Sequence, residues 1–166
     1  VRGKEGTQVV ITLERSGVTL EKSVTRKKLE TPVATGEMLS GNVGLVTIEN
    51  FDARCASETR QAVESLLEQG AQALIFDVRN NPGGYASELV KVLDYLLPEG
   101  ELFRTVTYDG KENVDYSDAN CLELPMAVLV NSSSYSAAEF FAAALSEYEA
   151  AVVVGEQTVG KGYFQN

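Results

Sequence analysis

The fold is decided by residues 73–84, which read ALIFDVRNNPGG. The apolar run from Ala73 to Val78 predicts a buried strand, and the polar turn that follows it ends in two glycines. Two similar runs, Val43–Ile48 and Met126–Val130, predict further buried strands. Because buried strands that alternate with helices form parallel sheets, we expect an α/β fold with a mostly parallel sheet covered on both faces.

Three helical patterns separate these strands. The first has Ser57 as its predicted N-cap and ends at Gly70, and the second runs from about Ala86 to Leu97. The third is rich in alanine, follows a polar turn at 131–134 and ends near Glu147. A last short strand is predicted at 151–155.

The remaining segments flank or interrupt this pattern. Residues 8–13 and 18–25 are rich in β-branched residues and predict a hairpin. Residues 27–40 contain proline, glycine and charged residues, which is typical of a linker. A strand is predicted at 102–108 and a polar loop at 109–120.

Composition excludes several classes of protein. The 166 residues suffice for one domain core, and 14 basic against 24 acidic residues give a net charge of −10. An acidic chain lacks the basic surface that nucleic-acid binding needs, and no apolar run approaches the ~20 residues of a membrane-spanning helix. The chain has no histidine, which excludes a Ser-His-Asp triad and a histidine-ligated metal within it.

The two cysteines, Cys55 and Cys121, have no metal-binding spacing. We expect buried free thiols, with a single disulfide as the alternative. The chain opens at Val1 rather than at a methionine and closes at Asn166 shortly after a glycine-rich turn. We therefore expect it to be truncated at both ends.

Unusual polar residues follow three of the buried strands, where parallel sheets collect their sites. After the strand at 73–78, Gly83 and Gly84 permit positive φ angles, so that backbone N–H groups could converge on an anion. A tight turn without further function is the alternative.

The second and third segments supply a possible nucleophile and base. Ser136 lies at the predicted start of the alanine-rich helix, whose N-terminus favours an oxyanion, although ordinary helix capping is the alternative and is preferred for residues 132–134. Lys161 lies between two glycines after the last strand, and a surface lysine in a flexible turn is the alternative. A desolvated lysine can act as a neutral general base, and Ser plus Lys is a known replacement for Ser plus His. Gln165 could orient the lysine.

These motifs together resemble those of the carboxyl-terminal processing peptidases, also called tail-specific proteases. That family shares the turn Asp-Leu-Arg-x-Asn-Pro-Gly-Gly, matched by Asp77–Gly84 with a valine in place of the leucine. Its serine segment, Ser-Ala-Ser-Ala-Ser-Glu, is matched by Ser134–Glu139, and its lysine segment by Thr158–Gly162 with Gln165. The family lysine lies 25 positions after the serine, as here, where 161 − 136 = 25.

The resemblance implies an architecture. We expect a Clp-protease/crotonase-like α/β core at residues 31–166, C-terminally incomplete, preceded at residues 1–30 by the remnant of a PDZ domain and its linking strands. Tyr135 and Ala138 depart from the family's serine motif. Tyr135 is bulkier than the usual alanine and could narrow the approach to Ser136.

The resemblance also implies a function, a serine endopeptidase that cleaves protein substrates near their C-terminus through an acyl-enzyme. Ser136 would be the nucleophile, Lys161 the base and Gln165 its holder. Backbone N–H groups of Gly83 or Gly84 and of Ala137 would bind the oxyanion. No metal or organic cofactor is expected. Protein or peptide substrates with C-terminal tails are the expected partners, and the resemblance implies an extracytoplasmic location, in the periplasm or cell envelope of a bacterium.

Two other classes remain open from the residues alone. A degenerate relative could capture protein tails without cleaving them. A crotonase-like acyl-CoA enzyme would share the fold and use the Gly83-Gly84 turn as its oxyanion hole. Labelling by a serine-directed phosphonate and a thioester turnover assay discriminate between these classes and a peptidase.

Overall fold

The computed structural model describes residues 1–28 and 31–163 and divides the chain into two units, Val1–Thr31 and Pro32–Asn166. The first unit holds one antiparallel hairpin of strands β1 (Gln8–Arg15) and β2 (Val18–Thr25). The hairpin confirms the two predicted strands. Its assignment to a PDZ domain stays a prediction.

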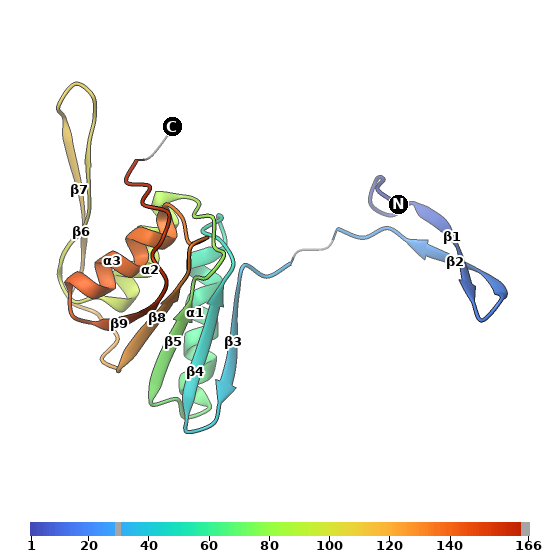
Figure 1. The fold of residues 1–166 in the computed structure, drawn as a ribbon, viewed down its shortest axis with the longest axis horizontal. Helices are drawn as coiled ribbons and strands as arrows, with labels where there is room; N and C mark the ends of the chain where they lie inside the picture. The colour runs from blue at the N-terminus through green and yellow to red at the C-terminus, as the bar shows by residue number, and fades with distance from the viewer. Residues whose placement is uncertain (29–30, 164–166) are drawn as a thin grey trace. The chain divides into compact units, whose positions relative to one another are not determined.

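A five-stranded sheet forms the centre of the second unit, in the order β3-β4-β5-β8-β9 (Figure 1). Its strands are β3 (Ala34–Leu39), β4 (Val43–Ile48), β5 (Ala73–Asp77), β8 (Met126–Val130) and β9 (Ala151–Gly155). Among the described strands of this sheet, only β3 runs antiparallel to its neighbour, and the other pairs are parallel. The mostly parallel sheet is confirmed.

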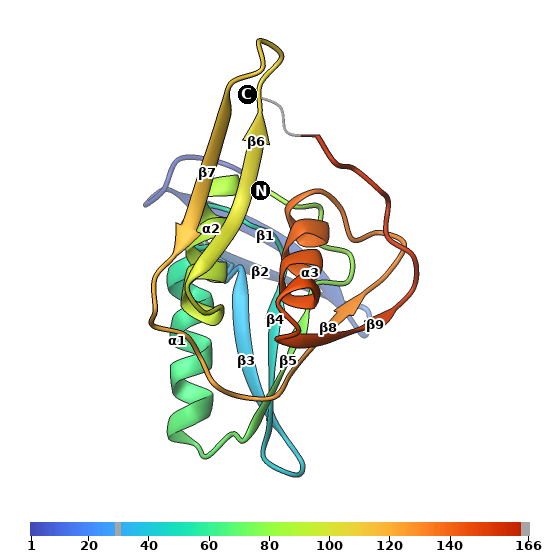
Figure 2. The same cartoon turned by 90° about the vertical axis from the view of Figure 1, so that its left-hand side faces the viewer.

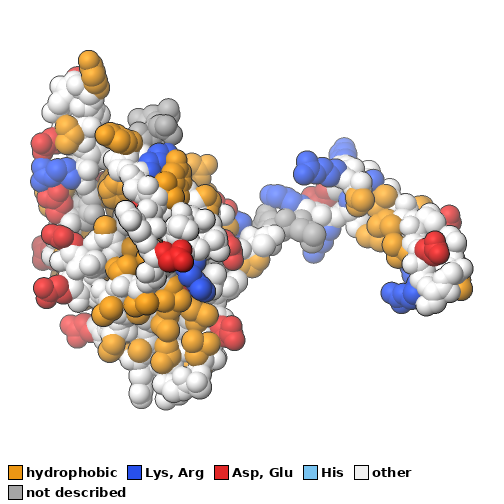
Figure 3. Space-filling view, in the orientation of Figure 1, with side chains coloured by type: hydrophobic (Ala, Val, Ile, Leu, Met, Phe, Trp, Pro, Cys, Tyr) orange, Lys and Arg blue, Asp and Glu red, His pale blue; other side chains and the backbone are white. Residues whose placement is uncertain are grey.

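The helices are α1 (Cys55–Glu68), α2 (Ala86–Leu96) and α3 (Ala137–Glu147). Each parallel connection steps in the same direction across the sheet, so that right-handed crossovers place all three helices on one face. Burial accordingly alternates along β4, β5 and β8 between buried and half-buried residues. The expectation of cover on both faces was therefore wrong for the described residues. Figure 3 shows hydrophobic side chains at the surface over these strands.

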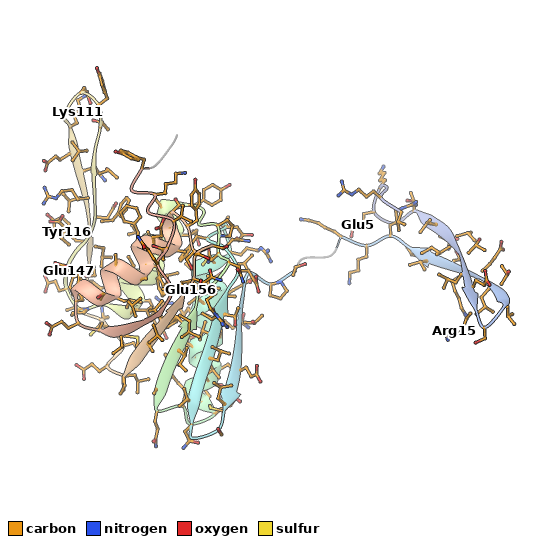
Figure 4. All side chains as sticks on the ribbon, viewed as in Figure 1. Glu5, Arg15, Lys111, Tyr116, Glu147 and Glu156 are labelled. Atoms are coloured by element: carbon orange, nitrogen blue, oxygen red, sulfur yellow. The ribbon has the colours of Figure 1, made fainter. Side chains whose placement is uncertain are left out.

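Two segments without a predicted strand form strands. Residues 34–39 of the predicted linker form β3, which pairs with β4 because the turn at 40–42 reverses the chain. Residues 112–117 of the predicted loop form β7 (Glu112–Ser117), which pairs with β6 (Gly100–Val106) in a separate hairpin. Figure 2 shows this hairpin standing clear of the sheet, and Figure 4 shows Lys111 at its tip. The dipeptide Asp109-Gly110 is typical of hairpin turns and indicates β7, although this segment was predicted to be a loop.

Helix α1 begins earlier than its predicted N-cap, Ser57. Arg54 occupies the N-cap position and offers no side-chain cap. The carboxylate of Asp52 accepts the N–H of Arg54 at 2.8 Å, and that of Glu88 on α2 accepts the N–H of Ala56 at 3.0 Å. These two carboxylates satisfy N–H groups at the helix start, so no serine cap is needed.

The core lies between the sheet and the helices. Leu89, Val92, Leu93 and Leu96 of α2 are buried, as their spacing predicted. Phe141 of α3 contacts the ring of Phe76 on β5 edge-on, with centroids 5.5 Å apart. This contact fixes α3, and therefore its N-terminus, against the sheet.

Candidate active site

The site lies where β5, β8 and β9 end, because parallel neighbours end at the same edge of the sheet. The segment after β8 contacts the segments after both other strands. The N–H of Tyr135 donates to the carbonyl of Asn81 at 3.0 Å, and the N–H of Val159 donates to the carbonyl of Ser134 at 3.3 Å. Glu156, labelled in Figure 4, accepts the N–H of Ser132 at 3.4 Å. The three polar segments therefore converge, as the sequence predicted.

Ser136 occupies the N-cap position of α3 in a strained conformation. Its φ is 55° and its ψ is −115°, outside the regions that non-glycine residues favour. The residue is only 7% exposed. Such outliers persist only where the surroundings hold them, and they are concentrated at functional sites.

Gly83 is one of the residues that pack closely around Ser136. A Cβ added to it would lie 2.9 Å from the Cβ of Ser136 and 2.8 Å from the carbonyl oxygen of Tyr135. Its φ of +88° would strain any other residue as well. Glycine is therefore required here by close approach to the serine.

Asn81 organises the glycine turn and was not singled out from the sequence. It is fully buried; its side-chain oxygen accepts the N–H of Gly83 at 2.8 Å, and its amide donates to the carbonyl of Ile48 at 2.7 Å. The N–H of Gly83 is thus engaged within the turn. Among the hydrogen bonds of the described residues, none uses the N–H of Gly84 or of Ala137.

Glu139 joins the serine segment to the lysine segment. Its Oε2 accepts the N–H of Ser136 at 2.8 Å and the N–H of Lys161 at 3.0 Å. Its Oε1 accepts the N–H of Gly160. Glu139 had no predicted role, although Ser-x-x-Glu before an apolar run is the signature of a capping box.

The environment of Glu139 favours its charged form. Desolvation raises the pKa of this carboxyl, but the hydrogen bonds from the Thr158 side chain and from the backbone N–H groups outweigh desolvation and hold the pKa below its ordinary value. The carboxylate is therefore ionised at neutral pH.

Lys161 approaches Tyr135, the residue before the serine. Its Nζ lies 4.7 Å from the centroid of the Tyr135 ring. Its side chain borders a cavity of about 290 Å³. The cavity is lined by Glu139, Phe140, Ala143, Gly160, Lys161 and Gly162.

Ser134 has a structural role, but it does not cap α3, whose N-cap is Ser136. Its hydroxyl is fully buried, donates to the carbonyl of Val78 at 2.8 Å and accepts the N–H of Asn131 at 3.0 Å. Asn131 in turn donates its amide to the side-chain oxygen of Asn80 at 2.9 Å. These bonds fasten the ends of β5 and β8 together.

Asp77 and Arg79 form a local ion pair at the end of β5. Oδ2 of Asp77 accepts from Nη2 of Arg79 at 2.6 Å, and Oδ1 accepts from Nε at 2.9 Å. Burial raises the pKa of Asp77, but the hydrogen bonds from Arg79 outweigh burial and leave the pKa below its ordinary value.

The remaining predicted residues lie elsewhere. Gln165 is outside the described residues. Cys55 and Cys121 are free thiols, as expected, but only Cys55 is buried, and Cys121 is half-buried. Within residues 1–28 and 31–163, no three His, Cys, Asp or Glu side chains group as a metal site would need.

Comparison with known proteins supplies an independent test. Residues 42–166 match the peptidase family S41. The chain is 34% identical over 168 residues to the carboxy-terminal processing protease CtpA of Bacillus subtilis, covering 99% of this chain and 36% of that protein. It thus spans about a third of the length of that relative.

Two solved structures share the fold. The photosystem II D1 C-terminal processing protease superposes with a TM-score of 0.74 at 28% identity, over 99% of this chain and 47% of the other. A lipoprotein from Streptococcus agalactiae superposes with a TM-score of 0.65 at 19% identity, over 82% of this chain and 53% of the other. The second similarity supports the fold alone.

Proposed function

Since this chain belongs to peptidase family S41, a family of C-terminal processing serine proteases, we propose that it carries the catalytic dyad of a serine endopeptidase. Ser136 is the nucleophile, and Lys161 is the general base. The substrates are proteins or peptides cut near their C-terminus, and the cleavage passes through an acyl-enzyme.

The single observation that carries the proposal is the contact of both segments with one carboxylate. Glu139 accepts the backbone N–H of Ser136 and that of Lys161 through the same oxygen. The backbones of two residues 25 positions apart in the sequence therefore meet at the same carboxylate oxygen. This supports their use as a nucleophile and its base.

The reaction proceeds in two halves. Neutral Lys161 takes the proton of the Ser136 hydroxyl as its oxygen attacks the scissile carbonyl, and the protonated lysine then gives that proton to the departing amine. The C-terminal product leaves, and an ester joins Ser136 to the remaining chain. Water, deprotonated by Lys161, attacks this ester, and collapse returns the proton to the serine oxygen and releases the new carboxyl terminus.

Backbone N–H groups stabilise the negative oxygen of each tetrahedral intermediate. Ala137 contributes from the start of α3, where the helix end also favours negative charge. Of the two glycines, Gly84 is favoured, because the N–H of Gly83 already donates to Asn81. Gln165 orients Lys161, a role based on the family resemblance.

The resemblance to tail-specific proteases supports an extracytoplasmic site of action. Among the described residues, no helix is long and apolar enough to cross a bilayer.

The test is labelling of the full-length protein by a fluorophosphonate, followed by digestion and identification of the labelled peptide. We expect labelling at Ser136 and cleavage of an unfolded protein with an apolar C-terminus. Ser136→Ala abolishes both, whereas the exposed Ser133→Ala leaves both unchanged.

Two results would overturn the proposal. Binding of the tail without cleavage by the wild-type protein would identify a degenerate module. Hydrolysis of an acyl-CoA thioester without proteolysis would identify a crotonase-like enzyme.

A further inference from the structure

Tyr85 directly follows Gly83 and Gly84, the two glycines of the site, and it is 62% exposed. We propose that Tyr85 is a specificity-determining residue whose ring packs against an apolar side chain of the substrate close to the scissile bond. This inference rests on the proposed function, because the N–H of the preceding residue, Gly84, is the proposed donor to the oxyanion.

The backbone of Tyr85 is held on both sides. Its N–H donates to the carbonyl of Phe51 at 2.7 Å, and Gly84 forms an isolated β-bridge with the same residue. The carbonyl of Tyr85 accepts the N–H groups of Glu88 and Leu89, each at 3.1 Å, in the first turn of α2. Phe51 is itself fully buried. An exposed side chain therefore stands on a backbone that is fixed against the core.

Covalent geometry limits how far this side chain can lie from the reacting groups. A Cβ built on Gly83 would lie 2.9 Å from the Cβ of Ser136. Tyr85 follows Gly83 by two residues, so their Cα atoms are at most about 7 Å apart. An extended chain rises about 3.3 Å per residue, so this distance corresponds to about two residues of a bound peptide. Position 85 is therefore close to the substrate residues nearest the cut.

Helix capping does not account for a tyrosine at this position. Tyr85 is the N-cap of α2, with φ −75° and ψ 127°, and its side chain makes no cap hydrogen bond. Serine, threonine, aspartate and asparagine are preferred at an N-cap because their side chains accept an N–H of the first turn. An exposed ring also removes little apolar surface from water on folding. Residues that break a local rule without a gain in packing are expected at functional positions.

The chemistry of the ring indicates what it binds. A tyrosine presents a large apolar surface and has only two side-chain torsions to fix when it is covered. It therefore gains most from an aliphatic or aromatic side chain that covers the ring and excludes water. The partner we infer is an apolar residue of the substrate within about two positions of the cut.

The experiment compares kcat/KM of the full-length protein on peptides that carry leucine or alanine at each of the two positions on either side of the cut. We expect the wild-type protein to prefer leucine at one of these positions by about 10-fold. Tyr85→Ser should lose this preference without a fall in Tm, because serine can cap α2. Tyr85→Phe should keep it. The control, Tyr116→Ser, removes a 63%-exposed tyrosine on β7 and should keep it as well (Figure 4).

A second variant tests the same contact by charge. Tyr85→Asp also supplies a good N-cap, and it should turn the preference from leucine to lysine at that position. A leucine preference that survives in either the Ser or the Asp variant would overturn the role of Tyr85. So would equal cleavage of all peptides by the wild-type protein. A purely structural role would instead lower the Tm and reduce kcat/KM for the leucine and alanine peptides together.

Labelling of Ser136 by a small alkyl fluorophosphonate separates this inference from the proposed function. The reagent carries no peptide, so the wild-type protein and Tyr85→Ser should be labelled at equal rates. Absence of labelling in the wild-type protein would overturn the dyad itself. Labelling of both proteins with an unchanged leucine preference would overturn only the role of Tyr85.

Discussion

At the scale of single residues, Glu139 joins the serine segment of the site to the lysine segment. Glu139→Gln keeps the size of the side chain but replaces one of the two acceptor oxygens by a donor, so it cannot serve the N–H groups of Ser136, Gly160 and Lys161 together. We expect kcat/KM to fall by about 10- to 100-fold, on the order of the loss of one or two charge-assisted hydrogen bonds.

The matched control for this variant is Glu147→Gln, at the other end of the same helix and exposed. It should leave kcat/KM unchanged. Equal activity of the two variants would show that Glu139 does not position the dyad.

Lys161→Arg tests the base at the same scale. A guanidinium remains charged and cannot accept the serine proton, so this variant should fold and show no turnover. The measurement is kcat/KM on an unfolded protein substrate at neutral and at mildly alkaline pH. An active arginine variant would refute the dyad.

The close approach of Gly83 to Ser136 gives a prediction about stability. Gly83→Ala adds a methyl group into backbone contacts shorter than 3.0 Å, in addition to the strain of a positive φ. Gly110→Ala, at the hairpin tip with φ +79° and nothing within 4 Å, adds the strain alone. We expect the free energy of unfolding to drop by about 1 kcal/mol for Gly110→Ala and by clearly more for Gly83→Ala, measured by urea titration.

At the scale of secondary structure, the sequence predicted those elements whose signals are local. The strands Met126–Val130 and Ala151–Gly155 and the end of α3 lie where their apolar runs place them. The missed features depend on partners distant in the sequence: β3 forms by pairing with β4, and the start of α1 is satisfied by Glu88 on another helix. No pattern within the segment itself reports such a partner.

The same difference between local signals and distant partners explains which residues of the site could be predicted. Ser136 and Lys161 could be chosen from motifs and their spacing. The role of Asn81 and the bonds that Glu139 accepts from Gly160 and Lys161 could not, because they join segments that only the folded sheet brings together. The engagement of the Gly83 N–H by Asn81, likewise, is visible only in the structure.

The carboxyl groups of Asp77 and Glu139 predict how the stability of the fold responds to acid. Asp77 and Glu139 have pKa values held below their ordinary 3.8 and 4.5, so each stabilises the folded state above its unfolded pKa, and the stabilisation is lost as pH falls through the lower, folded pKa. Urea midpoints should therefore be constant from pH 7 to ~5 and decline below about pH 4. In Glu139→Gln the decline should be smaller, and an identical decline would contradict the contribution of Glu139.

At the scale of the whole molecule, the two thiols differ in how deeply they are buried. Burial in the core, the largest effect, raises the pKa of Cys55 to about 12, so this thiol stays protonated and inaccessible near pH 8. Cys121 is half-buried. We expect one thiol per folded chain to react with a disulfide reagent at pH 8 and two after denaturation, counted by absorbance. Rapid reaction of both in the folded protein would contradict this packing.

The position of β9 at the edge of the sheet has a consequence for how the chain behaves in concentrated solution. Among the described strands it pairs with β8 alone, and Val152 and Val154 are 67% and 50% exposed. An uncharged, β-branched edge of this kind is a template on which another extended chain can add. Light scattering of this chain should therefore rise with concentration, and Val152→Lys, which places a charge on that edge, should suppress the rise.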